Sequence, residues 1–239
     1  INSSLSEVSW GTLAPQLYQE GIPVIKDINE TTASISVEYQ ITSQNSDGDT
    51  ELYDVKEFYR MRYLDTRIYL LDFQRSANQV FDGKLPVYSD DGIILGVRDK
   101  NVEYMMNDSA TVLAFVQEGD LWSYSPGNGK VNQVFSFRKT EDGDFRDSRI
   151  QHDIKIVRVT DAGDIDFVLY GYMNRGSHEG YEGIGVYHYN PDKNVAEERA
   201  FIPVSESFEF LKKDLEKLSY VNEENELFLL LAKSLYKSI

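Results

Sequence analysis

The chain has 239 residues, of which 41% are hydrophobic and 27% are charged, a balance typical of a folded protein rather than a disordered one. Forty acidic residues against 24 basic ones give a formal net charge of −16, which opposes binding to nucleic acids and to anionic lipid surfaces. There is no cysteine, so disulfides, thiolate catalysis and cysteine-ligated metal sites are excluded.

No segment of the sequence predicts a membrane-spanning helix. The longest uninterrupted apolar run, residues 227–232, is far shorter than the roughly 20 residues that such a helix needs. We therefore expect no direct membrane insertion of this segment. The chain begins with Ile1 and carries no signal peptide, so we expect it to be a piece of a longer protein.

Residues 1–21 are predicted to form an arm that packs on the rest of the chain. Their sequence is polar at first and mixed afterwards. Helical spacing of Trp10, Leu13 and Leu17 predicts a short helical turn, although Pro15 opposes it. Residues 22–27 are predicted as a first edge strand.

The remainder, residues 22–239, consists of short alternating or apolar runs separated by turn residues, which predicts an all-β protein. Residues 34–42 alternate cleanly, so their apolar side chains share one face. Residues 51–73 are predicted as two strands broken near residues 64–66. Their aromatic and β-branched content favours strands over a helix at residues 55–64. In the strand at residues 34–42, the side chains on the apolar face are Ile35, Val37, Tyr39 and Ile41.

Residues 111–137 predict three strands joined by two tight turns. The continuous apolar run 111–116 is typical of a strand that is buried on both faces. In the next strand Trp122 and Tyr124 share one face. The Pro-, Gly- and Asn-rich residues 125–129 then form the second turn.

Parts of this pattern recur along the chain. Residues 155–171 match residues 217–233 without a gap, at an offset of 62 (217 − 155). Both segments contain a short apolar strand, a polar turn and a second, nearly continuous apolar strand. Residues 102–117 follow the same plan with one gap.

A second match occurs further along the chain, in the strands that come after two of these segments. Residues 121–131 match residues 185–195 through an aromatic residue, a tyrosine, a proline turn and a valine. The prolines, Pro126 and Pro191, are 65 residues apart (191 − 126). The matches define about four antiparallel four-stranded units, at about residues 22–83, 93–137, 150–203 and 207–239.

This organisation resembles the blades of a β-propeller, in which sheets pack face to face around an axis. The resemblance implies an all-β fold of about four blades, either as part of a larger propeller or closed by a strand donated from residues 22–27. A β-sandwich is the alternative. One short amphipathic helix is predicted after Ser207, with Phe208, Leu211, Leu215 and Leu218 at helical spacing.

The glycine-rich residues 174–185 are the most unusual candidate for ligand binding. Acidic, basic and aromatic side chains are grouped there between two predicted strands, where a loop can present them to a ligand. The alternative is a long hairpin connection made of flexible, polar residues. The candidate binding residues are Arg175, His178, Glu179, Tyr181 and Glu182.

The acidic turn at residues 141–147 is the best candidate for a metal site. Asp142, Asp144 and Asp147 offer clustered carboxylates, which calcium prefers, but the turn does not match the twelve-residue calcium loop. The alternative is that Asp and Gly occur there because hairpin turns require them. We expect no other cofactor.

Cysteine-free, acidic and tyrosine-rich repeats of this kind resemble the ectodomains of uncharacterised Gram-positive surface or membrane-anchored proteins. The resemblance implies an exported bacterial protein at the cell surface. No repeated catalytic constellation accompanies the units, so we expect a non-catalytic binding or scaffolding module with a protein or glycan ligand. The alternatives are a glycan-active hydrolase that uses rim carboxylates and an extracellular sensor or regulatory domain.

Overall fold

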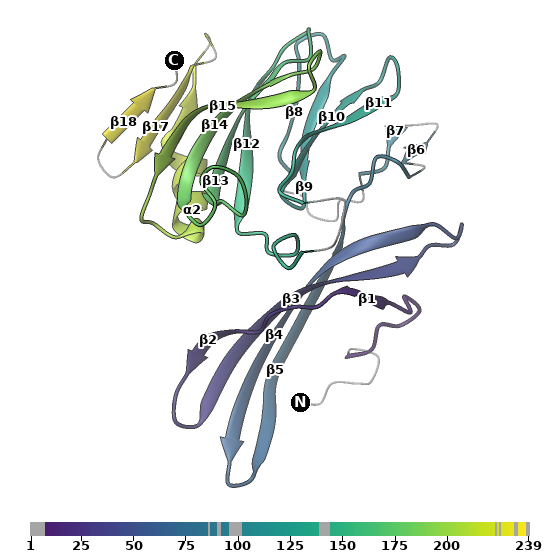
Figure 1. Cartoon of the computed structure of the whole chain (residues 1–239), viewed down its shortest axis with the longest axis vertical. Coiled ribbons are helices and arrows are strands. Elements are labelled where there is room, and N and C mark those ends of the chain that lie inside the picture. The colour runs from purple at the N-terminus through teal and green to yellow at the C-terminus, as the bar shows by residue number, and fades with distance from the viewer. Residues whose placement is uncertain are drawn as a thin grey trace. The chain divides into compact units, whose positions relative to one another are not determined.

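A computed structural model describes residues 8–85, 87–89, 92–95, 102–138, 144–222, 224, 226–231 and 234–237. The strands form antiparallel sheets of two to five strands, accompanied by a short helix (Figure 1). The prediction of an all-β chain with a short amphipathic helix is therefore confirmed. The chain divides into two compact units, unit 1 (Ile1–Arg98 with Arg138–Arg149) and unit 2 (Asp99–Phe137 with Ile150–Ile239).

Unit 1 is built around a long twisted sheet in the order β1-β3-β4-β5, with β2 also paired to β3. A separate two-stranded sheet joins β6 to β7. The strands of unit 1 are β1 (Gln16–Gln19), β2 (Val24–Ile28), β3 (Thr32–Gln44), β4 (Thr50–Leu64), β5 (Arg67–Gln79), β6 (Tyr88–Ser89) and β7 (Gly92–Ile93).

The N-terminal arm packs on one end of this sheet. Trp10 and Leu13 contact a buried cluster formed by Ile41, Tyr53 and Val55. The expected helical turn does not extend to residue 17, because Leu17 lies in β1 and pairs with Ile41. Pro15 lacks the amide hydrogen that a helix would use there, and the edge of β3 supplies strand partners instead.

The break expected near residues 64–66 is confirmed. β4 ends at Leu64 and β5 begins at Arg67, and the two strands pair along their whole length. Asp65, in the turn between them, has a left-handed φ of 53°. Aspartate tolerates this conformation better than most residues, which explains its place at the hairpin end.

Unit 2 contains three sheets whose strands follow one another in chain order. The sheets have the orders β11-β10-β9-β8, β12-β13-β14-β15 and β16-β17-β18. The elements are β8 (Tyr104–Met106), β9 (Leu113–Gln117), β10 (Asp120–Ser125), β11 (Lys130–Phe135), β12 (His152–Val159), β13 (Ile165–Tyr172), β14 (Glu182–Asn190), β15 (Val195–Pro203), α2 (Phe208–Leu218), β16 (Ser219–Val221), β17 (Leu227–Leu231) and β18 (Ser234–Lys237).

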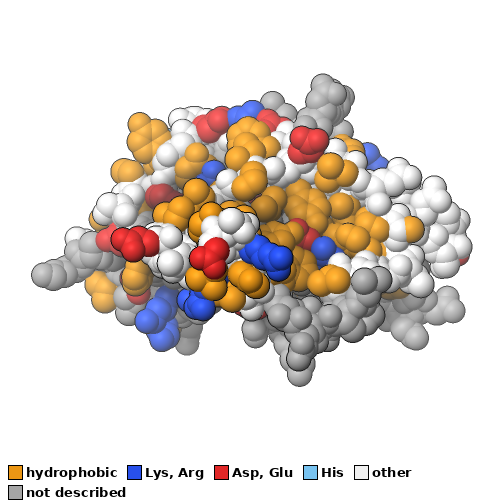
Figure 2. Space-filling model, turned by 90° about the horizontal axis from the view of Figure 1, so that it is seen from below, with side chains coloured by type: hydrophobic (Ala, Val, Ile, Leu, Met, Phe, Trp, Pro, Cys, Tyr) orange, Lys and Arg blue, Asp and Glu red, His pale blue; other side chains and the backbone are white. Residues whose placement is uncertain are grey.

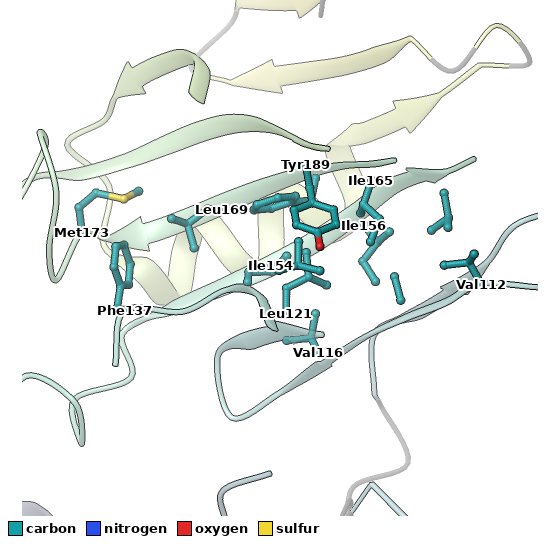
Figure 3. Close-up of a cluster of buried hydrophobic side chains, with 14 residues drawn as sticks. Val112, Val116, Leu121, Phe137, Ile154, Ile156, Ile165, Leu169, Met173 and Tyr189 are labelled. Atoms are coloured by element: carbon teal, nitrogen blue, oxygen red, sulfur yellow. The ribbon is translucent and has the colours of Figure 1, made fainter. Parts of the chain in front are cut away.

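The central strand of unit 2, β13, is buried on both faces. On one face Ile165, Phe167 and Leu169 pack against residues of β9 and β10, including Val116 and Leu121 (Figure 3). These side chains are almost completely removed from solvent. A strand of this kind must lie between two other layers, and β13 does so.

Helix α2 and the sheet β16-β17-β18 cover the opposite face of β13. Val168 and Tyr170 of β13 pack there against Leu211 and Leu215 of α2. Both leucines are buried, whereas Phe210 points to solvent, as the predicted amphipathic pattern requires. Ser207 occupies the N-cap position, and its carbonyl oxygen accepts the amide of Leu211 at 3.1 Å.

Two hairpins of unit 2 pair in the same register. Val159 pairs with Ile165 between β12 and β13, and Val221 pairs with Leu227 between β16 and β17. The second pair lies 62 residues beyond the first (221 − 159 and 227 − 165). The offset found in the sequence therefore joins residues that occupy equivalent places in two hairpins.

The turns of these hairpins are closed by equivalent hydrogen bonds. The amide of Thr160 donates to the carbonyl of Asp164 at 2.9 Å, and the amide of Asn222 donates to that of Glu226 at 3.1 Å. In both turns the side-chain oxygen of the first residue also accepts the amide of the last, at 3.0 and 2.8 Å respectively.

The outer strand pairs β10–β11 and β14–β15 also share an irregularity. Their pairing shifts between Leu121 and Trp122 in β10, and between Val186 and Tyr187 in β14. The two shifts are 65 residues apart (186 − 121), which is the spacing of the matched prolines. A bulge bends a strand and increases its twist, so these two sheets are shaped alike at this point.

Replacing Phe167 by Ala is expected to lower the unfolding free energy of unit 2 by about 3–5 kcal/mol, because it opens a cavity where the side chain is fully buried. Each unit contains one of the two tryptophans, so a Trp10→Phe background leaves Trp122 as the reporter for unit 2. Urea unfolding followed by tryptophan fluorescence measures the change. The exposed Tyr181→Ala serves as the control and should change stability by less than about 0.5 kcal/mol.

Candidate functional site

The predicted ligand-binding loop is an ordered connection between β13 and β14. The amide of Met173 donates to the carbonyl of Tyr181 at 2.9 Å, and the amide of Gly180 donates to the carbonyl of Met173 at 3.0 Å. Glu179 continues this network through its amide, and Glu182 is the first residue of β14. Tyr181 is the exposed ring of the loop.

Two polar side chains of this loop, Arg175 and His178, form hydrogen bonds to different parts of unit 2. The Nε atom of Arg175 donates to the carbonyl oxygen of Phe137 at 2.6 Å, just beyond β11. His178 instead lies on β15, with its Nε2 atom 2.9 Å from Glu198 and its ring stacked on Phe201. These contacts explain how the loop is held, and its binding of a ligand stays a prediction.

Of the three aspartates predicted to bind calcium, Asp142 lies outside the described residues. The Asp144 carboxylate forms an ion pair with Arg146 at 2.6 Å. Asp147 is buried, and its carbonyl oxygen accepts a hydrogen bond from Arg138 at 2.8 Å. Among the residues that the structure describes, no group of three or more His, Asp or Glu side chains is arranged to hold a metal ion. The calcium site stays a prediction.

Unit 1 contains a cleft of about 220 Å³ that is partly open to solvent. Its lining combines apolar side chains with three carboxylates. Glu51 is already hydrogen-bonded by the hydroxyl of Tyr53 at 2.6 Å. A ligand with an apolar body and a positive charge would match these lining side chains chemically. The lining includes Phe81, Leu85, Val87, Asp47, Glu51 and Asp82.

The most distinctive surface of unit 1 is one face of its long sheet. Residues directly opposite one another on neighbouring strands share a face, so register defines cross-strand rows. One row is Ile25, Ile35, Tyr59 and Phe73, the next is Ile28, Ala33, Met61 and Leu70, and the last is Tyr63 and Ile68. We call these ten residues the apolar patch.

Much of the apolar patch is open to solvent. The exposed fractions of Ile25, Ile28, Tyr63 and Ile68 are 60%, 66%, 55% and 69%. The β4–β5 hairpin is seen in Figure 1, and Figure 2 shows hydrophobic side chains gathered on the face that is in view. Isolated exposed apolar residues are ordinary, but a contiguous group across four strands is a candidate contact surface.

A buried carboxylate separates the apolar patch from the end that the arm covers. Glu57, only 6% exposed, pairs with Arg75 in the next cross-strand row. Its Oε1 atom accepts hydrogen bonds from Arg75 Nε at 2.6 Å and from the Tyr39 hydroxyl at 2.9 Å. Its Oε2 atom accepts one from the Tyr59 hydroxyl at 2.5 Å. Arg75 also lies over the ring of Trp10, 4.1 Å from its centroid.

These contacts shift the pKa values of the groups that share them. Burial by itself would raise the pKa of Glu57, but the hydrogen bonds from Tyr59, Arg75 and Tyr39 outweigh it and hold the pKa below its usual value. Burial and the neighbouring carboxylate raise the pKa of Tyr59 to about 12 and also raise the pKa of Tyr39. Glu57 is therefore a charged, fully engaged group within an otherwise apolar face.

Comparison with known families and with curated proteins finds no matching family model and no matching curated sequence. None of the helices in the described part of the chain is both long and apolar enough to cross a lipid bilayer. The function must therefore be argued from the surfaces themselves.

Sequence reasoning found only one strand of the apolar patch. The alternation in residues 34–42 placed Ile35 on the apolar face of its strand, and the pairing of Ile35 with Tyr59 agrees with this. Nothing in the local pattern showed that Ile25 and Phe73 lie in the same row. The available signal was the density of apolar residues in 58–71, which becomes a surface only after register is known.

Replacing Glu57 by Gln is expected to lower the unfolding free energy of unit 1 by about 2–4 kcal/mol at pH 7, because Arg75 loses its buried partner. The folded pKa of Glu57 is lowered, so its stabilisation is present above about pH 4.5 and is lost as pH falls through the folded pKa. Urea unfolding of the Trp122→Phe background, reported by Trp10, should show this acid dependence weakened in the Gln variant. Equal acid dependence in both proteins would contradict the assignment, and the exposed Glu30→Gln is the matched control.

Proposed function

We propose that this chain is a non-catalytic binding module and that unit 1 holds another protein surface through the apolar patch. The observation that carries the proposal is the group of exposed Ile, Leu and Tyr side chains on β2, β4 and β5, joined by partly buried Ala33 and Ile35 of β3. Seven of the ten patch side chains have no ring for stacking on a sugar, and they gain free energy when another apolar surface removes them from water. A protein surface therefore suits them better than a glycan.

The size of the patch supports this role. Four strands about 4.8 Å apart and three rows about 6.7 Å apart give a flat area of roughly 300–400 Å². The largest apolar patch of a typical monomer is of this size, and such patches are often functional. The buried Glu57–Arg75 pair at its border carries no net charge, so it does not oppose an apolar partner.

A scaffolding role for unit 2 is the second part of the proposal, with its sheets arranged like the blades of a propeller. Three observations support it: the chain-order antiparallel sheets, the burial of β13 between two layers, and the matched registers of its hairpins. A crystal structure of the chain should show successive sheets related by similar rotations about one axis. Rotations about unrelated axes would contradict the propeller-like arrangement.

An exported or surface-anchored bacterial location completes the proposal. The resemblance to such ectodomains supports it, and the cysteine-free composition and net charge of −16 are part of that resemblance. Localisation of the natural protein by cell fractionation tests it. Recovery of the protein in the cytosolic fraction alone would contradict the exported location.

The accessibility of the apolar patch can be tested with Nile red, a neutral dye whose emission rises on apolar surfaces. The wild-type protein should enhance its emission, and the double variant Ile25→Ser with Ile68→Ser should lose most of the enhancement, because two of the most exposed apolar side chains are removed. Both positions are more than half exposed, so the fold should survive.

A matched control is Leu235→Ser, which changes an equally exposed apolar residue in β18 of unit 2. It should leave most of the enhancement in place. Equal emission from wild type and from the patch variant would show that the patch does not bind apolar molecules, and the proposed role of unit 1 would then be wrong. Circular dichroism confirms that each variant is folded.

A further inference from the structure

We propose that the apolar patch is covered by the same patch of a second copy of this chain, so that two sheets pack face to face across a two-fold axis. This inference rests on the proposed function, and it names the partner. A two-fold interface requires a surface that is complementary to itself. Flat sheet faces with regular apolar rows meet this requirement, because the inner faces of two packed sheets interdigitate about 10 Å apart.

The charge distribution favours a second copy over a charged partner. The ten residues of the patch include no carboxylate and no basic side chain, although the chain as a whole has a net charge of −16. No carboxylate within the patch would attract a basic protein, and no cation would attract an acidic one. Two anionic copies can approach here without burying an unpaired charge, which the core of an interface does not tolerate.

The edge of unit 1 is compatible with this arrangement. Within the described residues β5 pairs only with β4, so it is an edge strand, and its residues Ile68 and Leu70 belong to the patch. Exposed apolar strands of this length lead to uncontrolled association unless something covers or interrupts them. A closed two-fold dimer covers the face of this strand without the help of another protein.

The area predicts a weak dimer. Two patches together contribute roughly 600–800 Å² of flat contact before the surrounding residues are counted, and specific interfaces of small area are usually transient. We expect a dissociation constant of about 10–100 µM. Each copy carries a charge of −16, so salt should screen the repulsion and strengthen the dimer. A contact between opposite charges would weaken with salt instead.

Sedimentation velocity from about 1 to about 200 µM, at about 50 and about 500 mM NaCl, tests the inference on the full chain. The wild-type protein should change from monomer to dimer over this range, at lower concentration in high salt. Ile68→Asp should weaken the dimer about tenfold or more, because it places a charge in the apolar contact. Dimerisation that high salt weakens, or that Ile68→Asp leaves unchanged, would overturn the inference.

The matched control is Leu64→Asp, which makes the same change on the same hairpin. Leu64 neighbours Tyr63 in β4 and therefore points to the opposite face of the sheet. This variant should still dimerise, and a loss equal to that of Ile68→Asp would overturn the face-to-face arrangement. Tryptophan fluorescence and circular dichroism show whether both variants are folded.

Crosslinking provides a second measurement that does not depend on disrupting the interface. The chain has no cysteine, so Met61→Cys, in the middle row of the patch, introduces a single thiol. A residue in the middle of the patch lies closest to a two-fold axis through its centre, so a short bis-maleimide should join two Met61→Cys chains efficiently and two Leu64→Cys chains poorly. Equal crosslinking at both positions would count against the proposed face.

The Nile red and sedimentation measurements separate the two proposals. If the wild-type protein stays monomeric at every concentration while its patch still binds Nile red, the second copy is the wrong partner and the binding role of unit 1 stands. If the patch fails to bind Nile red while the protein is monomeric, both proposals fail.

Discussion

Each apolar sheet face in this chain needs a second layer of protein. A strand carries side chains on both faces of its sheet, and exposure of apolar side chains to water is unfavourable. In unit 2 the requirement is met from within. β13 is apolar on both faces and lies between the sheet of β9 and β10 on one side and α2 with β17 on the other. The remaining features of unit 2, including its chain-order sheets, follow from keeping β13 covered.

Unit 1 meets the same requirement only in part. Trp10 and Leu13 cover one end of its apolar face, and the cover stops where Glu57 and Arg75 interrupt the rows. Beyond this pair the patch residues Ile28, Tyr63 and Ile68 are more than half exposed. The hydrogen-bonded Glu57–Arg75 pair therefore marks the border between the buried cluster under the arm and the exposed apolar patch.

The matched registers in unit 2 connect a pattern in the sequence to a physical cause. A one-residue slip between paired strands would move every apolar side chain to the wrong face. The offset of 62 therefore persists as equivalent pairs, Val159 with Ile165 and Val221 with Leu227. The shared pairing shift before Trp122 and Tyr187 indicates that strand twist is matched as well.

The sequence by itself determined the all-β class, the strand break near Leu64 and the buried helix face of Leu211 and Leu215, because alternation, turn chemistry and helical spacing act over a few neighbouring residues. It did not determine that Leu17 pairs with Ile41, nor that Ile25, Ile35, Tyr59 and Phe73 form one row. Those facts depend on register between strands that are distant in sequence, and only the tertiary structure fixes it. The same holds for Glu57. In the sequence it is one of 40 acidic residues, and only the tertiary structure shows the three hydrogen-bond donors around it.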